Sequence, residues 1–278
     1  MKKSKLMNRI SQNLGAIVIT LVAVIWILPV LWMISTSFKP ESMVMQAIPH
    51  WIPEVFTLDN YKGVLQRADL FRWIFNSVVV AVGTTVTVLL INSMAGYAFA
   101  RIKFPGRDIL FLTVIATMMV PAQVTMIPLF FVLNEMSLLN THLSLALPRL
   151  GVAIGVFMLR QFFLSLPLDL EEAALIDGCS RYRIFFQIVL PLAKPSLSAL
   201  GILTFVWTWN DFMWPLIAIS SNDMYTLPIG LSTLVGYYGR EYGIQMAGAF
   251  IATLPVLVVF MLFQKQFIEG IAFSGLKG

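Results

Sequence analysis

Ionisable side chains within apolar sequence are the first residues to test for chemistry, and two stand out. Arg149 and Asp211 each interrupt a long hydrophobic block. Ionisable groups inside a membrane commonly serve proton, ion or substrate pathways. Two interpretations of Arg149 stay open. Its guanidinium could snorkel to the outer interface, or it could face an anionic solute.

An aromatic and polar cluster follows late in the fifth hydrophobic block. It comprises Trp207, Trp209, Asn210, Asp211 and Trp214. Aromatic rings beside hydrogen-bonding groups suit a sugar, but they are also typical of an interfacial belt. Both interpretations stay open, and the candidate solute-contact residues are Arg149, Trp209, Asn210 and Asp211.

The motifs of common enzymes are missing from the sequence. It contains no G-x-x-x-x-G-K-[ST] phosphate loop, no H-E-x-x-H and no C-x-x-C. His50 and His142 are the two histidines, so a catalytic metal site is not expected. Cys179, the one cysteine, is interpreted as a small turn residue, with a reactive thiol as the alternative. Energy for any transport must then come from another subunit or from an ion gradient.

Composition indicates a membrane protein. Of the 278 residues, 58% are hydrophobic and 12% are charged, whereas soluble domains carry roughly 25% charged residues. The net charge is +5, but no basic run is interleaved with stacking aromatics, so nucleic acid is not an expected partner. The basic excess instead fits the preference of Lys and Arg for cytoplasmic loops.

Six hydrophobic blocks are long enough to cross a bilayer, which takes roughly 20 helical residues. They cover residues 14–34, 74–99, 109–133, 143–163, 197–219 and 246–264. The first block is interpreted as a retained span rather than a signal peptide, because it is long and no small-x-small site follows it. Most Lys and Arg residues fall on the loops of one side, which predicts that both termini are cytoplasmic. The sequence therefore predicts an all-α, multi-pass membrane protein.

The loop at residues 165–195 is polar and predicts two short helices joined by a bend. Acidic residues of the first helix lie near the positive end of its dipole, and Leu170, Ala173 and Ala174 form a stripe of apolar side chains. Gly178 can end this helix in a left-handed conformation, and Ser180 can cap the next.

The second helix has one apolar face, formed by Ile184, Phe185, Ile188 and Val189. An amphipathic connector lying on lipid headgroups would explain it. That interpretation explains poorly the acidic first helix beside an anionic leaflet, so we expect a protein partner in a groove contact.

The skeleton of this loop is E-A-A, three residues, G, nine residues, then I-x-L-P. It resembles the cytoplasmic signature of permease subunits of binding-protein-dependent ABC importers. The resemblance implies a six-helix, type-I importer permease fold and a coupling helix that docks on the ATPase, where Glu172 meets a basic residue. The implied coupling residues are Glu171, Glu172, Ala173, Ala174, Asp177, Gly178, Ile188, Leu190 and Pro191.

Two further stretches resemble carbohydrate-type permeases. Residues 96–107 resemble the loop after the second span. Residues 267–278 resemble the tail of the smaller maltose-type permease, which implies contact of Gly275, Lys277 and Gly278 with the ATPase. Phe273 and Ser274 depart from the usual small pair. The expected divisions are a cytoplasmic N-terminus (1–13), a first span (14–35), an extracytoplasmic loop (36–72), a type-1 transmembrane domain (73–265) and a cytoplasmic tail (266–278).

The resemblance implies a non-catalytic permease subunit that forms half of a pathway for a sugar, an oligosaccharide or a sugar-like solute. Its implied partners are a second permease, two ATP-binding subunits, an extracytoplasmic solute-binding protein and the lipid of a prokaryotic cell membrane. ATP and Mg would be bound by the ATPase, and this chain would hold no cofactor. A stand-alone gradient-driven transporter or channel is the alternative. It predicts paired intramembrane charges, which the sequence does not indicate.

Overall fold

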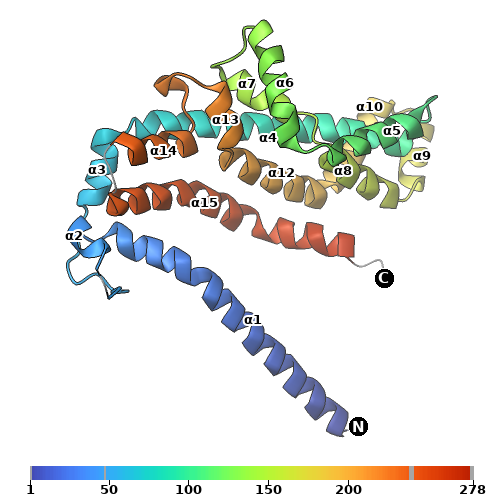
Figure 1. The fold of residues 1–278 in the computed structure, drawn as a ribbon. Helices are drawn as coiled ribbons and strands as arrows, with labels where there is room; N and C mark the ends of the chain where they lie inside the picture. Colours follow the sequence, from blue (N-terminus) through green and yellow to red (C-terminus); the bar gives the residue numbers. More distant parts are fainter. Residues whose placement is uncertain (1, 47, 238–240, 276–278) are drawn as a thin grey trace. The chain divides into compact units, whose positions relative to one another are not determined.

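The computed structural model describes residues 2–46, 48–237 and 241–275, and within these residues every regular element is a helix. The predicted all-α class is therefore confirmed (Figure 1). The elements are α1 Lys2–Ser37, α2 Glu41–Val44, α3 Asp59–Arg67, α4 Leu70–Arg101, α5 Arg107–Ala116, η1 Thr117–Met119, α6 Ala122–Glu135, α7 His142–Ala146, η2 Leu147–Arg149, α8 Ala153–Ser165, α9 Asp169–Ile176, α10 Arg181–Ile184, η3 Phe185–Val189, α11 Leu190–Leu192, α12 Lys194–Trp209, α13 Met213–Ala218, η4 Asn222–Met224, α14 Leu227–Tyr237 and α15 Tyr242–Gly275.

Among the residues that the structure describes, three single helices and three bent helix pairs are long and apolar enough to cross a membrane. The single helices are Gly15–Ser37, Leu70–Arg101 and Tyr242–Lys265. The bent pairs are Arg107–Met119 with Ala122–Glu135, His142–Arg149 with Ala153–Ser165, and Arg181–Leu192 with Lys194–Trp209. Counting each pair as one span gives up to six spans.

Three of the predicted blocks are not continuous helices. The third bends by 103° at a break that contains Pro121, and the fourth bends by 48° between residues 149 and 153. The fifth was predicted to run through residues 197–219, but its helix ends at Trp209 and α13 begins separately at Met213. A proline that follows a helix fits the first break, because it disfavours helical geometry in the residue before it.

The chain divides into two units, of which the larger comprises residues 69–230 and 255–278. Within it, α4 packs against α8 and α12. With a rise of 1.5 Å per residue, the 32 residues of α4 span about 48 Å, which exceeds the thickness of a bilayer core. Gly96 allows the contact with α8, because a Cβ there would lie 3.0 Å from the backbone nitrogen of Arg160. Small residues permit such close approach of membrane helices.

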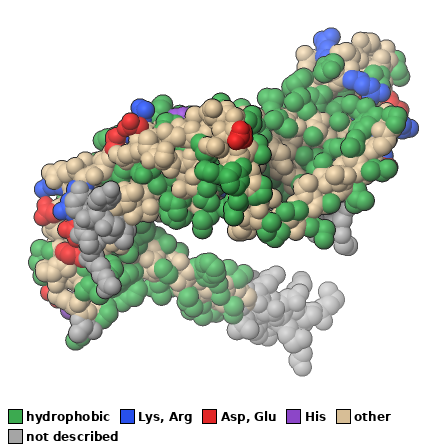
Figure 2. All heavy atoms as spheres, turned by 45° about the horizontal axis from the view of Figure 1, so that its top comes forward, with side chains coloured by type: hydrophobic (Ala, Val, Ile, Leu, Met, Phe, Trp, Pro, Cys, Tyr) green, Lys and Arg blue, Asp and Glu red, His purple; other side chains and the backbone are tan. Residues whose placement is uncertain are grey.

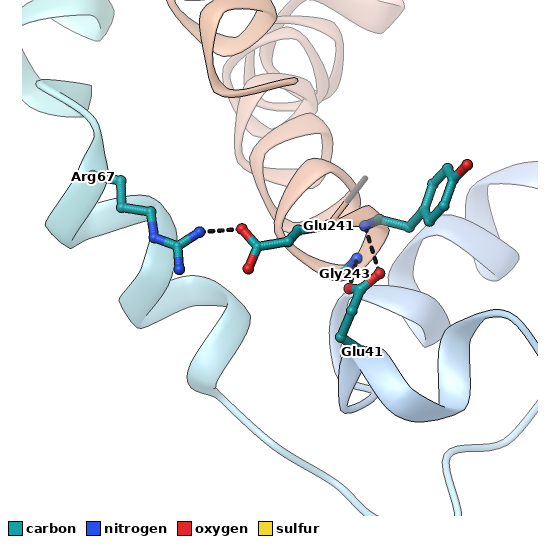
Figure 3. A network of polar contacts seen from close by, with 5 residues as sticks. Glu41, Arg67, Glu241 and Gly243 are labelled. Carbon is teal, nitrogen blue, oxygen red and sulfur yellow. Dashed lines mark hydrogen bonds and ion pairs between the residues drawn. The ribbon is translucent and has the colours of Figure 1, made fainter. Parts of the chain in front are cut away.

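The smaller unit comprises residues 1–68 and 231–254. Asn60 of α3 donates hydrogen bonds to the carbonyls of Ser37 (2.9 Å) and Lys39 (2.8 Å). The carboxylate of Glu41 accepts from the backbone nitrogens of Tyr242 (2.9 Å) and Gly243 (2.8 Å), the first residues of α15 (Figure 3). Arg67 pairs with Glu241 in the same network. The predicted outer loop is thus folded onto the start of α15.

Candidate functional site

The loop at residues 165–195 has the predicted form of two helical segments joined at a glycine. Gly178 has φ = 79°, and the nitrogen of Cys179 donates to the carbonyl of Ala174 at 2.9 Å, which is the helix-ending bond of a Schellman motif. The hydroxyl of Ser180 accepts from the nitrogen of Arg183 at 3.4 Å. The predicted glycine bend and serine cap are both confirmed.

The inner face of α9 carries a charge. Glu171 is 7% exposed, and its Oε1 lies 2.9 Å from Nε of Arg101 in α4. The hydroxyl of Tyr97 donates to its Oε2 at 2.8 Å. Arg101 also donates through Nη2 to the carbonyl of Leu166 at 2.6 Å, directly after α8. Ala174, one turn further along α9, is buried beside this group.

The outer face of α9 carries the neighbouring carboxylate. Glu172 and Ala173 are exposed, as are Asp177 and Gly178. Large apolar side chains accompany them: Leu170, Leu175, Ile176 (87% exposed) and Tyr182 (81% exposed). The predicted stripe of Leu170, Ala173 and Ala174 is therefore split, since only Ala174 packs inside the chain. Figure 2 shows Lys and Arg side chains gathered at the end of the larger unit that holds α5, α9 and α10 in Figure 1.

The second segment turns its apolar face into the chain. Ile184, Phe185 and Val189 are buried in one cluster with Tyr97, Leu159 and Phe163, and Ile188 and Leu190 pack at its edge. Pro191 is exposed in α11. A π-helical turn covers Phe185–Val189. The apolar face that a headgroup-bound connector would place in lipid is packed against α4 and α8.

The structure brings together Arg149 and Asp211, two of the three charged residues of the hydrophobic blocks; the third is Arg160. Nη2 of Arg149, in η2, lies 2.6 Å from Oδ2 of Asp211, just beyond the end of α12. The side chains are 31% and 12% exposed. The sequence did not indicate paired charges in the spans, and this ion pair corrects that expectation. It joins the two places where the fourth and fifth blocks cease to be helical.

The aromatic cluster is divided between the inside and the outside of the chain. Trp209 is 2% exposed and stacks on Phe205, with the ring centroids 5.7 Å apart. Trp214 is buried and donates to the carbonyl of Ser144 at 2.8 Å, whereas Trp207 and Asn210 are exposed. An interfacial belt therefore fits Trp207 better than it fits the other two tryptophans.

Sequence reasoning did not identify Tyr97 and Arg101 as contacts of the loop residue Glu171. Both lie in the stretch that resembles carbohydrate-type permeases, and their spacing of four residues places them on one face of α4. Their partner, Glu171, lies 74 residues after Tyr97 and 70 residues after Arg101, so the stretch at residues 96–107 alone could not reveal it. Of the predicted tail contacts, Gly275 ends α15, and Lys277 and Gly278 lie outside the described residues.

The fold and the loop define a class of protein, the helical membrane subunit that contacts another protein. It has several apolar spans and a charged loop that also exposes large apolar side chains. Residues 89–271 match the family described as "Binding-protein-dependent transport system inner membrane component". The chain belongs to this family. It is a transport permease of an ABC importer that works with a binding protein, and it is not a catalytic subunit.

Curated relatives extend the similarity to nearly the whole chain. The arabinooligosaccharides transport system permease protein AraQ of Halalkalibacterium halodurans is 42% identical over 260 residues, which cover 92% of this chain and 93% of that protein. The lactose transport system permease protein LacG of Rhizobium radiobacter is 34% identical over 253 residues, which cover 91% and 92%.

A solved structure shares the fold. One chain of a bacterial ABC transporter involved in the import of the acidic polysaccharide alginate superposes with a TM-score of 0.79 at 24% identity, covering 93% of this chain and 97% of that chain. The predicted type-I importer permease fold is therefore confirmed.

Proposed function

We propose that this chain forms half of the translocation pathway of an ATP-driven importer for a sugar or an oligosaccharide. The names of the relatives support a carbohydrate solute. A second permease would supply the other half, two ATP-binding subunits would bind ATP and Mg, and an extracytoplasmic binding protein would deliver the solute. Both termini would lie in the cytoplasm, and the tail at Gly275, Lys277 and Gly278 would approach the ATPase.

The outer face of α9 is the observation that carries the ATPase contact. Ile176 at the end of α9 and Tyr182 in the following α10 are more than four-fifths exposed, and such apolar groups beside a polar rim mark protein contacts. A short helix with this face suits a groove on a partner. Glu172, exposed on the same side, would pair with a basic residue there. Asp177 and Gly178 would complete the contact, and Ile188, Leu190 and Pro191 would support it.

The solute pathway would pass the Arg149–Asp211 pair, with Asn210 and Trp209 near it. Because Asp211 compensates the charge of Arg149 at 2.6 Å, the pair offers hydrogen-bonding groups without a net charge. That property fits an uncharged, hydroxyl-rich solute. Asn210 is exposed and is the residue of this set best placed for a direct contact.

The test is a reconstituted complex with the ATPase, the second permease and the binding protein. Glu172→Ala should weaken binding of the ATPase subunit and lower ATP-driven uptake about tenfold, since loss of roughly 1.4 kcal/mol corresponds to that factor. Asp169→Ala is the matched control, because it removes an exposed carboxylate from the same helix, and it should leave both within about twofold. Unchanged ATPase binding in Glu172→Ala would contradict the proposal.

The sequence left open a stand-alone gradient-driven transporter, for which paired charges such as Arg149 and Asp211 would be expected, but membership of the binding-protein-dependent family contradicts that alternative. Vesicles that contain only this chain and an ion gradient test this alternative. Uptake there without ATP or an ATPase would support it over the importer.

A further inference from the structure

We propose that Glu171, Arg101 and Tyr97 form an internal clamp that transmits motion of the coupling helix α9 to the span α4. The proposal rests on the proposed ATPase contact and assigns its two neighbouring glutamates different tasks. Glu172 binds outward to the ATPase, whereas Glu171 is a positioning residue that holds the helix to the rest of the chain.

The geometry of the clamp fixes both oxygens of one carboxylate. Oε1 of Glu171 lies 2.9 Å from Nε of Arg101, and Oε2 accepts from the hydroxyl of Tyr97 at 2.8 Å. The side chains of Arg101 and Glu171 are only 5% and 9% exposed. The ion pair at one oxygen and the hydrogen bond from Tyr97 at the other hold the carboxylate at two points, which resists rotation of α9 about its own axis more than an apolar contact alone would.

The same guanidinium reaches a third helix. Arg101 donates to the carbonyl of Leu166 at 2.6 Å, and this residue follows α8 directly. One cation thus connects the ends of α4 and α8 with the start of α9. A displacement of α9 would therefore act on two membrane helices that pack against each other. The remaining inward side chain, Ala174, offers little surface for this purpose.

Removal of the charge should uncouple the helix without abolishing its docking. Glu171→Gln keeps the shape of the side chain and leaves Glu172 exposed. We expect it to bind the ATPase subunit normally and to lower the solute transported per ATP hydrolysed by about tenfold, within the range of coupling energies known for such networks. Tyr97→Phe, which removes one hydrogen bond, should lower this ratio by roughly threefold.

The experiment measures three quantities in the reconstituted complex: ATPase-subunit binding, ATP hydrolysis and solute uptake. The double variant Tyr97→Phe/Glu171→Gln should be no worse than Glu171→Gln, because both changes break one unit. A wild-type ratio of solute to ATP in Glu171→Gln would overturn the proposal. Loss of ATPase binding equal to that of Glu172→Ala would also overturn it, since Glu171 would then belong to the docking surface.

Two controls distinguish a failure of the clamp from a failure of the proposed ATPase contact and from a failure of Glu171→Gln to assemble. Normal ATPase binding in Glu172→Ala would refute the proposed docking contact, whatever Glu171→Gln does. Should Glu171→Gln fail to assemble, Arg101→Lys and Tyr97→Phe replace it. Arg101→Lys keeps the cation but loses the planar fork, so a partial loss of coupling is expected. Wild-type coupling in both variants would overturn the clamp.

Discussion

The Arg149–Asp211 ion pair gives the sharpest prediction about stability. Arg149→Ala would leave the carboxylate of Asp211, which is 12% exposed, without the cation that lies 2.6 Å away. Asp211→Ala would leave the guanidinium of Arg149 unpaired, but this side chain is 31% exposed and so is less buried than the carboxylate of Asp211. Arg149→Ala is therefore expected to be the more destabilising of the two.

The magnitude follows from the burial. Removing one partner of a fully buried pair costs about 3–5 kcal/mol, whereas exposed pairs contribute about 0–1 kcal/mol. The intermediate exposure of Arg149 places its loss at about 2 kcal/mol. A domain of 150–250 residues loses about 2–4 °C in Tm per kcal/mol, so we expect a Tm lower by roughly 4–8 °C.

A double-mutant cycle by thermal unfolding in detergent measures the pair itself. The double variant should be more stable than the sum of the single changes implies, with a coupling energy of about 1–2 kcal/mol. The control pair is Lys62 and Asp59, which lie 3.3 Å apart but are 66% and 77% exposed. Its coupling should stay below about 0.5 kcal/mol. Equal coupling energies for the two pairs would refute the reasoning from burial.

Three further substitutions should destabilise the chain, and a fourth serves as a control, in the same unfolding assay. Gly230→Ala would place a Cβ 2.1 Å from the buried ring of Trp73 and should cost about 3 kcal/mol, whereas Gly83→Ala, with nothing within 4 Å, should be neutral or stabilising. Glu41→Ala removes both acceptors at the start of α15 and should cost about 1–2 kcal/mol. Trp214→Phe removes one buried donor and should cost about 1–2 kcal/mol. Values below about 0.3 kcal/mol, well under the usual effect of a buried change, would contradict each expected loss.

Features determined by local sequence were predicted well. Long apolar blocks identify candidate spans because the bilayer requires them. The bend at Gly178 and the cap at Ser180 follow from backbone geometry within a few residues. The breaks were harder to place. Pro121 ends a helical stretch, yet Pro128 lies inside α6, so proline alone does not locate a break in a membrane helix.

Pairings between distant residues were not predictable. Glu171 and Arg101 are separated by 70 positions, and Arg149 and Asp211 by 62. In a soluble helix, apolar periodicity shows which face is buried. In a membrane span, the lipid-facing side is as apolar as the core, so that contrast is weak. Only the few polar side chains could indicate which faces of the spans pack together, and their partners can be identified only when the fold is known.

The clamp is proposed to position α9 without adding to the stability of the chain, and one double variant can test this. Glu171 and Arg101 lose hydration on burial, and replacing such pairs with apolar groups of similar volume is often neutral or stabilising. Glu171→Met/Arg101→Met should therefore unfold at the same temperature as the natural chain or higher. Without the ion pair and the hydrogen bond from Tyr97, however, α9 would be free to turn against α4, so solute transport per ATP should fall as far as in Glu171→Gln. A double variant that is fully coupled would show that packing alone transmits the motion.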